Sequence, residues 1–183
     1  MRPFQISDAA EMLSLNADPE VMRFVPDKPF EDLLEAKRFL QHYDAWKHGF
    51  GRWAVIRRED GAWLGWCGLR KSPRTGLVDL GFRFHRKYWG NGYATEAGIA
   101  SLKWGFGEPG LPCLLVQGSQ VQIESSRRSS DIKSVGLHQS GVIARTMPAN
   151  LASQQVLIKL GFELIGEFED QEWSGRLYRT FSA

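Results

Sequence analysis

The chain has little of what marks several large classes of protein. It has only two cysteines, Cys67 and Cys113, and they show neither the CxxC spacing of a zinc site nor the density of a disulfide framework. Its four histidines are scattered and form no HExxH motif, so we expect no metal site. No apolar run approaches the ~18 residues of a membrane span, and none follows Met1. These absences predict a cytoplasmic protein in a reducing compartment, with no membrane partner.

An excess of charge is also missing. Lys and Arg number 23 against 21 Asp and Glu, a net charge of +2 that does not by itself indicate nucleic acid. One local cluster is both basic and aromatic: Arg83, Phe84, Arg86, Lys87, Tyr88 and Trp89. An RNA surface or a phosphate-bearing cofactor would explain this cluster equally well, but no nucleic-acid motif accompanies it, so we expect no nucleic-acid partner. The length of 183 residues predicts a single domain over residues 1–183.

The most informative stretch runs from Leu77 to Trp104. Residues 78–85 alternate apolar side chains with Asp, Gly, Arg and His, which is the period of a strand with two unlike faces. Four later residues have helical spacing and predict an apolar stripe: Tyr93, Ala97, Ala100 and Trp104. The sequence therefore predicts a strand, a glycine turn at residues 90–92 and a helix.

A glycine turn that leads into a helix favours an anion, because unpaired N–H groups meet the positive end of the helix dipole. Asn91-Gly92 could instead form a plain hairpin turn, although residues 93–104 have helical rather than strand period. A dinucleotide fingerprint fits poorly because the third glycine is missing, and the chain has no Gly-Lys pair for a P-loop. Phosphate is therefore the expected ligand.

The run KYWGNGYATEA, Lys87 to Ala97, resembles the acyl-CoA pyrophosphate loop of the GNAT superfamily of N-acetyltransferases. It is most similar to the branch that acetylates ribosomal-protein N-termini (RimJ/RimL-like), although that loop usually opens with Gln or Arg where this chain has Lys87. The resemblance implies an α+β (mixed α/β) GNAT fold, with a central, mostly antiparallel twisted sheet flanked by helices. It also implies acetyl-CoA as the acyl donor.

The resemblance further implies which residues hold acetyl-CoA. Backbone N–H groups near Phe82 and Arg83 would bind the carbonyl oxygen of the thioester. Asn150, which by itself predicts a helix N-cap, would also hydrogen-bond the pantetheine arm. The implied cofactor-binding set is Phe82, Arg83, Phe84, Lys87, Trp89, Gly90, Asn91, Gly92, Tyr93, Ala94, Asn150 and Ser153.

Two residues, one of them already in the cofactor-binding set, are candidates for proton transfer. Asp79 is the expected base, directly or through water, and the alternative is a solvated charge on a strand face. Ser153 is the expected acid for the departing thiolate, and the alternative is a role in the first helical turn. An α-amine of pKa near 8 costs about 1.4 kcal/mol to deprotonate at pH 7, against about 4.6 kcal/mol for a lysine amine, so an α-amine asks less of the protein.

The remaining segments supply the frame. Residues 1–4 leave only a stub of the family's first strand, Ser7 is the expected N-cap of a helix ending at Asp18-Pro19, and a second helix is expected from Phe30 to Lys47. Strands are expected at 52–58, 63–70, 162–168 and 176–181. Residues 113–116 and 142–146 compete for one more strand, and we favour 142–146. Between them, residues 117–141 are rich in Ser and Gln and predict a flexible insertion.

Together these features predict an acetyl-CoA-dependent N-acetyltransferase. It would act by direct attack of a primary amine, either a protein N-terminal α-amine or a small-molecule amine, and would be a monomer or homodimer. A non-catalytic or degenerate acyl-CoA-binding protein is the main alternative, because the shortened first strand and the insertion both touch elements that shape the cleft. An RNA-binding module is a further alternative.

Overall fold

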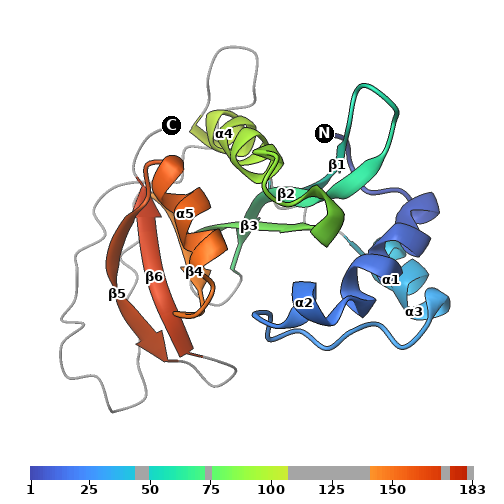
Figure 1. The fold of residues 1–183 in the computed structure, drawn as a ribbon, viewed down its shortest axis with the longest axis horizontal. Helices are drawn as coiled ribbons and strands as arrows, with labels where there is room; N and C mark the ends of the chain where they lie inside the picture. The colour runs from blue at the N-terminus through green and yellow to red at the C-terminus, as the bar shows by residue number, and fades with distance from the viewer. Residues whose placement is uncertain (44–49, 73–75, 107–140, 170–173, 181–183) are drawn as a thin grey trace.

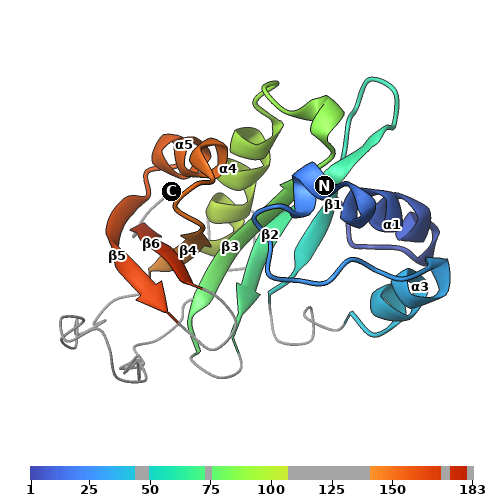
Figure 2. The same ribbon diagram turned by 60° about the horizontal axis from the view of Figure 1, so that its bottom comes forward.

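The computed structural model describes residues 1–43, 50–72, 76–106, 141–169 and 174–180. Within these ranges six strands form one sheet in the order β1-β2-β3-β4-β6-β5 (Figure 2). The strands are β1 (Arg52–Ile56), β2 (Trp63–Lys71), β3 (Val78–Phe84), β4 (Val142–Thr146), β5 (Glu163–Glu169) and β6 (Ser174–Thr180). All neighbours are antiparallel except β3 and β4. The predicted mixed, mostly antiparallel sheet is therefore confirmed.

Helices cover both faces of this sheet (Figure 1). On one face α4 (Tyr93–Phe106) packs on β2 and β3, with α5 (Leu151–Lys159) beside it. The N-terminal helices cover the other face of β1 and β2: η1 (Ile6–Asp8), α1 (Ala9–Ala17), α2 (Pro19–Met22) and α3 (Leu33–Gln41). Because side chains alternate along a strand, β2 serves both cores: Cys67 and Leu69 join the α4 side, whereas Trp66 joins the α1 and α3 side.

The strand, turn and helix predicted between Leu77 and Trp104 are all present, as β3, the glycine turn and α4. The helix buries a slightly different stripe from the predicted one, since Ala100 is exposed and Ser101 and Leu102 face the core. The choice of Val142 to Thr146 as a strand is confirmed, because it is β4. The competing segment 113–116 and residues 117–140 of the predicted insertion lie outside the described residues.

Two predicted helix boundaries are wrong. Ser7 is not an N-cap: residues 6–8 form a 3-10 turn, and the carboxylate of Asp8 instead accepts the Gln5 N–H at 2.8 Å. The helix expected from Phe30 begins at Leu33, because the Asp32 side chain caps it by accepting the Glu35 N–H at 2.8 Å. It ends at Gln41 rather than at Lys47, and residues 44–47 of the predicted helix lie outside the described residues.

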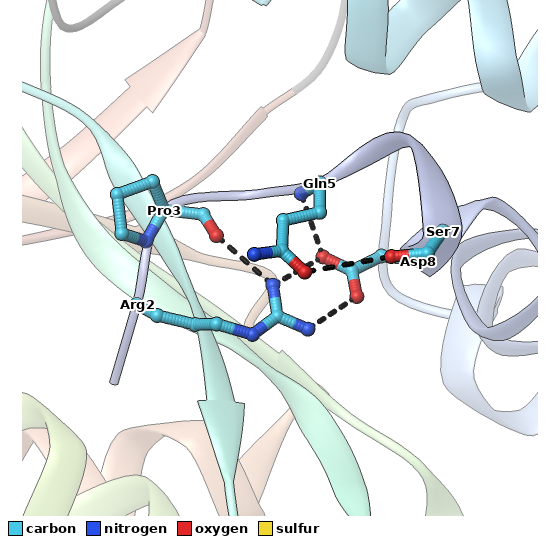
Figure 3. Close-up of polar contacts among 5 residues, drawn as sticks. All are labelled: Arg2, Pro3, Gln5, Ser7 and Asp8. Carbon is cyan, nitrogen blue, oxygen red and sulfur yellow. Dashed lines mark hydrogen bonds and ion pairs between the residues drawn. The ribbon is translucent and has the colours of Figure 1, made fainter.

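The chain around Arg2 is tied to the sheet. Arg2 forms a two-hydrogen-bond bridge with Ala54 of β1, at 3.0 and 2.9 Å. Its guanidinium also donates to both oxygens of Asp8 at 2.7 and 2.5 Å, as Figure 3 shows. Asp8 is only 3% exposed, so this ion pair fastens the chain before β1 to the start of α1. One bridge and one ion pair thus hold Arg2 against β1 and the start of α1.

Candidate active site

The sheet opens between its two parallel strands. β3 and β4 pair only at Val78 with Val142 and at Asp79 with Ile143, although both strands continue beyond these residues. A cavity of ≈ 440 Å³ adjoins this opening. Its lining includes residues 79–83 of β3, residues 144–146 of β4, the start of α5 and the N-terminal helices. Two strand edges that are not paired with each other therefore face a common space.

The direction of the β3 amides follows from the register with β2. The His85 N–H donates to the Leu64 carbonyl at 3.0 Å, and Phe84 lies opposite Gly65. Because N–H directions alternate along a strand, the Arg83 N–H also points at β2, whereas the N–H groups of Phe82 and Phe84 point away from β2 towards the opening. Phe82 thus supplies the better-directed donor of the two residues expected to hold a carbonyl oxygen.

The glycine turn has the conformation that its sequence requires. Gly90 and Gly92 have φ of 77° and 81°, a left-handed region that other residues rarely adopt, and a Cβ at either would meet open space. The Asn91 side chain fixes the turn by donating to the carbonyls of Tyr88 and Trp89 at 3.1 and 3.0 Å. The first helical bond of α4 runs from the Glu96 N–H to the Gly92 carbonyl, so the preceding N–H groups of the first turn have no acceptor within the helix.

The side chains before this turn have different surroundings from one another. Trp89 is 46% exposed and its indole donates to the Phe84 carbonyl at 2.8 Å, which anchors the loop to the end of β3. The Phe84 ring is buried in the core, so only the backbone of this predicted residue is near the loop. Lys87 is exposed, with its ammonium 5.0 Å from the centre of the Tyr88 ring.

Asn150 and Ser153 lie together at the start of α5, on the β4 side of the opening. The Asn150 carbonyl oxygen accepts the Ser153 N–H at 3.1 Å, which confirms the predicted N-cap. The Asn150 amide nitrogen and the Ser153 hydroxyl form no hydrogen bond with any described residue, and both residues line the cavity. These two groups are therefore available to a ligand in the opening.

Asp79 is not the solvated strand charge that the sequence left open. It is 8% exposed and lies between two guanidinium groups, with Arg52 Nη2 at 3.5 Å and Arg70 Nε at 3.7 Å. Both distances exceed the 2.7–3.2 Å usual for a hydrogen bond. The carboxylate thus faces the cavity in a positive environment and keeps room for a further donor.

The Arg83 side chain turns away from the cofactor loop. It donates to the Asn16 side chain and to Asp27, the latter at 2.8 Å, and so links β3 to the N-terminal helices and the segment after them. Burial lowers the pKa of Arg83, an effect that the Asp27 carboxylate partly offsets. The guanidinium therefore takes no part in the exposed basic cluster formed by Arg86 and Lys87.

Several residues that line the cavity are not in the set of site residues predicted from the sequence. Trp66 is 7% exposed and has guanidinium groups near its ring, Arg52 at 4.4 Å and Arg83 at 5.3 Å from the ring centre. Tyr43 accepts the Arg52 N–H at 2.7 Å, and burial raises the pKa of its phenol. The sequence shows polar residues at alternate positions of each strand, which indicates that they share a face. It does not show that residues from different elements meet at one cavity.

The cavity thus unites Asp79, Phe82, Arg83, Asn150 and Ser153. The turn residues 90–92 and the first two residues of α4, Tyr93 and Ala94, are not part of its lining. Among the described residues, no three His, Cys, Asp or Glu side chains are grouped so as to hold a metal ion. None of the helices in the described ranges is long and apolar enough to cross a membrane.

Comparison with known proteins agrees with this geometry. The model of the acetyltransferase (GNAT) domain family matches residues 1–163. An uncharacterized N-acetyltransferase p20 of Bacillus licheniformis is 24% identical over 185 aligned positions, which cover 99% of this chain and 88% of the relative. A GNAT-family acetyltransferase structure from Bacillus anthracis superimposes with a TM-score of 0.71 at 22% identity, covering 98% and 92% of the two chains. Spermidine N-acetyltransferase from Vibrio cholerae, solved with CoA and spermine, gives 0.67 at 13% identity, covering 97% and 90%.

The chain belongs to the GNAT acetyltransferase family. The predicted GNAT fold and the predicted class of enzyme, an acetyl-CoA-dependent N-acyltransferase, are confirmed at the level of the family. The narrower ribosomal-protein branch stays a prediction. The acceptor is not fixed by the family either.

Proposed function

We propose that this chain transfers the acetyl group of acetyl-CoA to a primary amine, a protein N-terminal α-amine or a small-molecule amine, by direct attack on the thioester. The observation that carries the proposal is the opening between β3 and β4 beyond Asp79 and Ile143, which joins a cavity under the N-terminal helices. Donor and acceptor can approach this opening from opposite faces of the sheet.

The donor half of the site uses mainly backbone groups. The turn at Gly90 to Gly92 and the first-turn amides of α4 suit the pyrophosphate of CoA, because they combine free N–H groups with the positive end of a helix dipole. The Phe82 N–H is directed to hold the thioester oxygen as negative charge builds on it. The Asn150 amide nitrogen would donate to the pantetheine arm while its oxygen caps α5.

Asp79 is the proposed base, acting directly or through water. Its position at the cavity wall and its long contacts with Arg52 and Arg70 leave it able to accept a proton from a nearby donor. Asp79→Asn keeps the shape and removes the base, so kcat/KM should fall and lose its dependence on the ionisation of this carboxylate. An unchanged profile of kcat/KM against pH would remove Asp79 from the mechanism.

Ser153 is the proposed acid for the departing thiolate, because its hydroxyl has no partner among the described residues and lines the same cavity as Asn150. Ser153→Ala should lower kcat with little change in the Kd of CoA. Ser153→Thr retains a hydroxyl and serves as the matched control. Normal turnover in the alanine variant would favour solvent as the proton donor.

The deciding experiment is thermal unfolding with and without acetyl-CoA, followed by an assay of free thiol. A ligand at 100 times its Kd adds about 2.7 kcal/mol of stability, which corresponds to roughly 5–10 °C in a domain of this size. Such a shift together with amine-dependent thiol release would support the proposed transfer. A shift without release for any amine would favour a non-catalytic acyl-CoA-binding protein, and no shift would contradict both.

A further inference from the structure

The cavity beside the β3–β4 opening is rich in positive charge. Its lining contains five basic side chains and two acidic ones: Lys28, Arg52, Arg70, Arg83 and Arg145 against Asp27 and Asp79. Polyamines and aminoglycosides carry several positive charges, so this lining would repel them. An acceptor that fits the cavity should instead bring negative charge with it.

The positive charges are not equally compensated. Arg83 is satisfied by Asp27 and Asn16. Arg52 and Arg70 share the single carboxylate of Asp79, at 3.5 and 3.7 Å. Lys28 is exposed at the cavity and forms no ion pair within the described part of the chain. The guanidinium of Arg145 lies 5.5 Å from the centre of the Phe168 ring, so we assign the surplus charge to Arg52, Arg70 and Lys28.

The Arg52 side chain reaches the cavity because glycines occupy the positions of β2 and β3 that it crosses. Arg52 pairs with Gly68 and Gly68 pairs with Gly81, so its side chain can cross two strands on one face. A Cβ at Gly81 would lie 2.8 Å from Arg52 Nη2, which shows how closely the guanidinium approaches the β3 backbone. The Nε of Arg52 is buried and finds no hydrogen-bond acceptor among the residues that the structure describes. This guanidinium is thus held in place with donor capacity unused.

One part of the cavity wall is aromatic and adjoins Arg52, whose backbone N–H donates to the Tyr43 hydroxyl at 2.7 Å. Phe4 lies edge-on to Tyr43 at 5.0 Å between ring centres, and Phe39 lies 5.7 Å from Tyr43 and 5.5 Å from Phe30. All four residues line the cavity, and Phe39 is 41% exposed. Such a wall offers edge and face contacts to another ring.

We propose that the acceptor is a small amine that carries a carboxylate beside its amino group and an aromatic side chain, the chemistry of an aromatic α-amino acid. This inference rests on the proposed acetyl transfer and names the substrate class for the same site. The carboxylate binds the Arg52, Arg70 and Lys28 group, and the ring packs on Phe4, Phe39 and Tyr43. The amine nitrogen bonds to the acetyl carbon, the carbon–sulfur bond breaks, the amine proton leaves to Asp79 or water, and the thiolate takes a proton to give CoA.

Three acceptors that share a ring and differ in charge test the proposal: phenylalanine, phenylalaninamide and phenethylamine. We expect kcat/KM, expressed per neutral amine, to be at least about tenfold higher for phenylalanine, the effect of roughly one charge-assisted hydrogen bond. Spermidine should be a poorer acceptor than all three. Equal values for the three ring compounds, or the highest value for spermidine, would overturn the proposal.

Substitutions in the cavity test which residues cause the preference for phenylalanine. Arg70→Gln and Lys28→Gln remove surplus charge at the cavity without touching the Arg52 side chain, which packs on Trp66. Each should reduce the preference for phenylalanine over phenethylamine several-fold and leave the Kd of CoA unchanged. Lys71→Gln is the matched control, because Lys71 follows Arg70 on β2 and is absent from the cavity lining. A preference that survives both cavity variants would overturn the proposal.

A measurement of acceptor binding tests the inferred carboxylate site independently of the proposed acetyl transfer. If no acceptor is acetylated, calorimetry with the CoA-saturated chain still compares phenylalanine with phenethylamine. Binding of phenylalanine alone would support the carboxylate site while the proposed catalysis failed. Binding of neither compound, or of both equally, would contradict the carboxylate site.

Discussion

The ion pair between Arg2 and Asp8 gives the sharpest test of what holds the residues around Arg2 against β1 and α1. Asp8 is 3% exposed and accepts three hydrogen bonds, two from Arg2 and one from the Gln5 N–H. Arg2→Ala removes the cation that pairs with this carboxylate. The buried Asp8 then keeps one backbone donor.

The size of the loss follows from burial. Breaking a fully buried ion pair costs about 3–5 kcal/mol, whereas exposed pairs contribute about 0–1 kcal/mol. The Arg2 side chain is 32% exposed and that of Asp8 only 4%, so water can replace part of the missing interaction. We expect about 2 kcal/mol of lost stability, which lowers Tm by roughly 4–8 °C in a domain of this length.

Urea unfolding followed by tryptophan fluorescence measures this change, and Arg57→Ala is the matched control. Arg57 also donates two hydrogen bonds to one carboxylate, that of Asp60, at 2.9 and 2.5 Å, but the Asp60 side chain is 46% exposed. The control should therefore change little. Equal effects of Arg2→Ala and Arg57→Ala, or less than about 0.5 kcal/mol for Arg2→Ala, would refute the argument that burial gives the N-terminal pair its value.

Three other predictions test the turn and two buried groups. Gly92→Ala should lower the free energy of unfolding by about 1–2 kcal/mol in a urea titration, because a φ of 81° costs alanine about that much, and an unchanged midpoint would contradict this. Burial lowers the pKa of His85 more than Glu11 raises it, so stability present above about pH 6.5 should fall as the pH drops. The loss of Tm between pH 7.5 and 5.5 should be smaller in His85→Phe, and an equal loss would exclude His85 as its source. Burial also raises the pKa of the Cys67 thiol to about 12, so peptide mass analysis should find it alkylated only after unfolding.

Predictions from the sequence were most accurate for site residues whose role depends on the local backbone conformation. The turn at Gly90 to Gly92 needs left-handed glycines and a helix that begins directly after it, and both requirements are visible in neighbouring letters. Asn150 was predicted as an N-cap for the same reason, since a cap and the amide that it binds lie three residues apart. The helix start at Leu33 was missed because Asp32, rather than the nearby candidate, makes the controlling hydrogen bond, and the start at Ala9 was missed because a 3-10 turn at residues 6–8 precedes that helix.

The positive charge of the acceptor cavity could not be predicted from neighbouring residues in the sequence. Arg52, Arg70 and Asp79 lie on three strands, and each by itself resembles an ordinary polar position facing solvent. They meet only because the register places Gly68 and Gly81 between Arg52 and the far side of the sheet, and because the N-terminal helices cover that face. Composition indicates a net charge near zero, yet the cavity concentrates an excess of one sign. The acetyl-CoA half of this site can therefore be predicted from residues close together in the sequence. The acceptor half cannot, because it depends on the register of the strands.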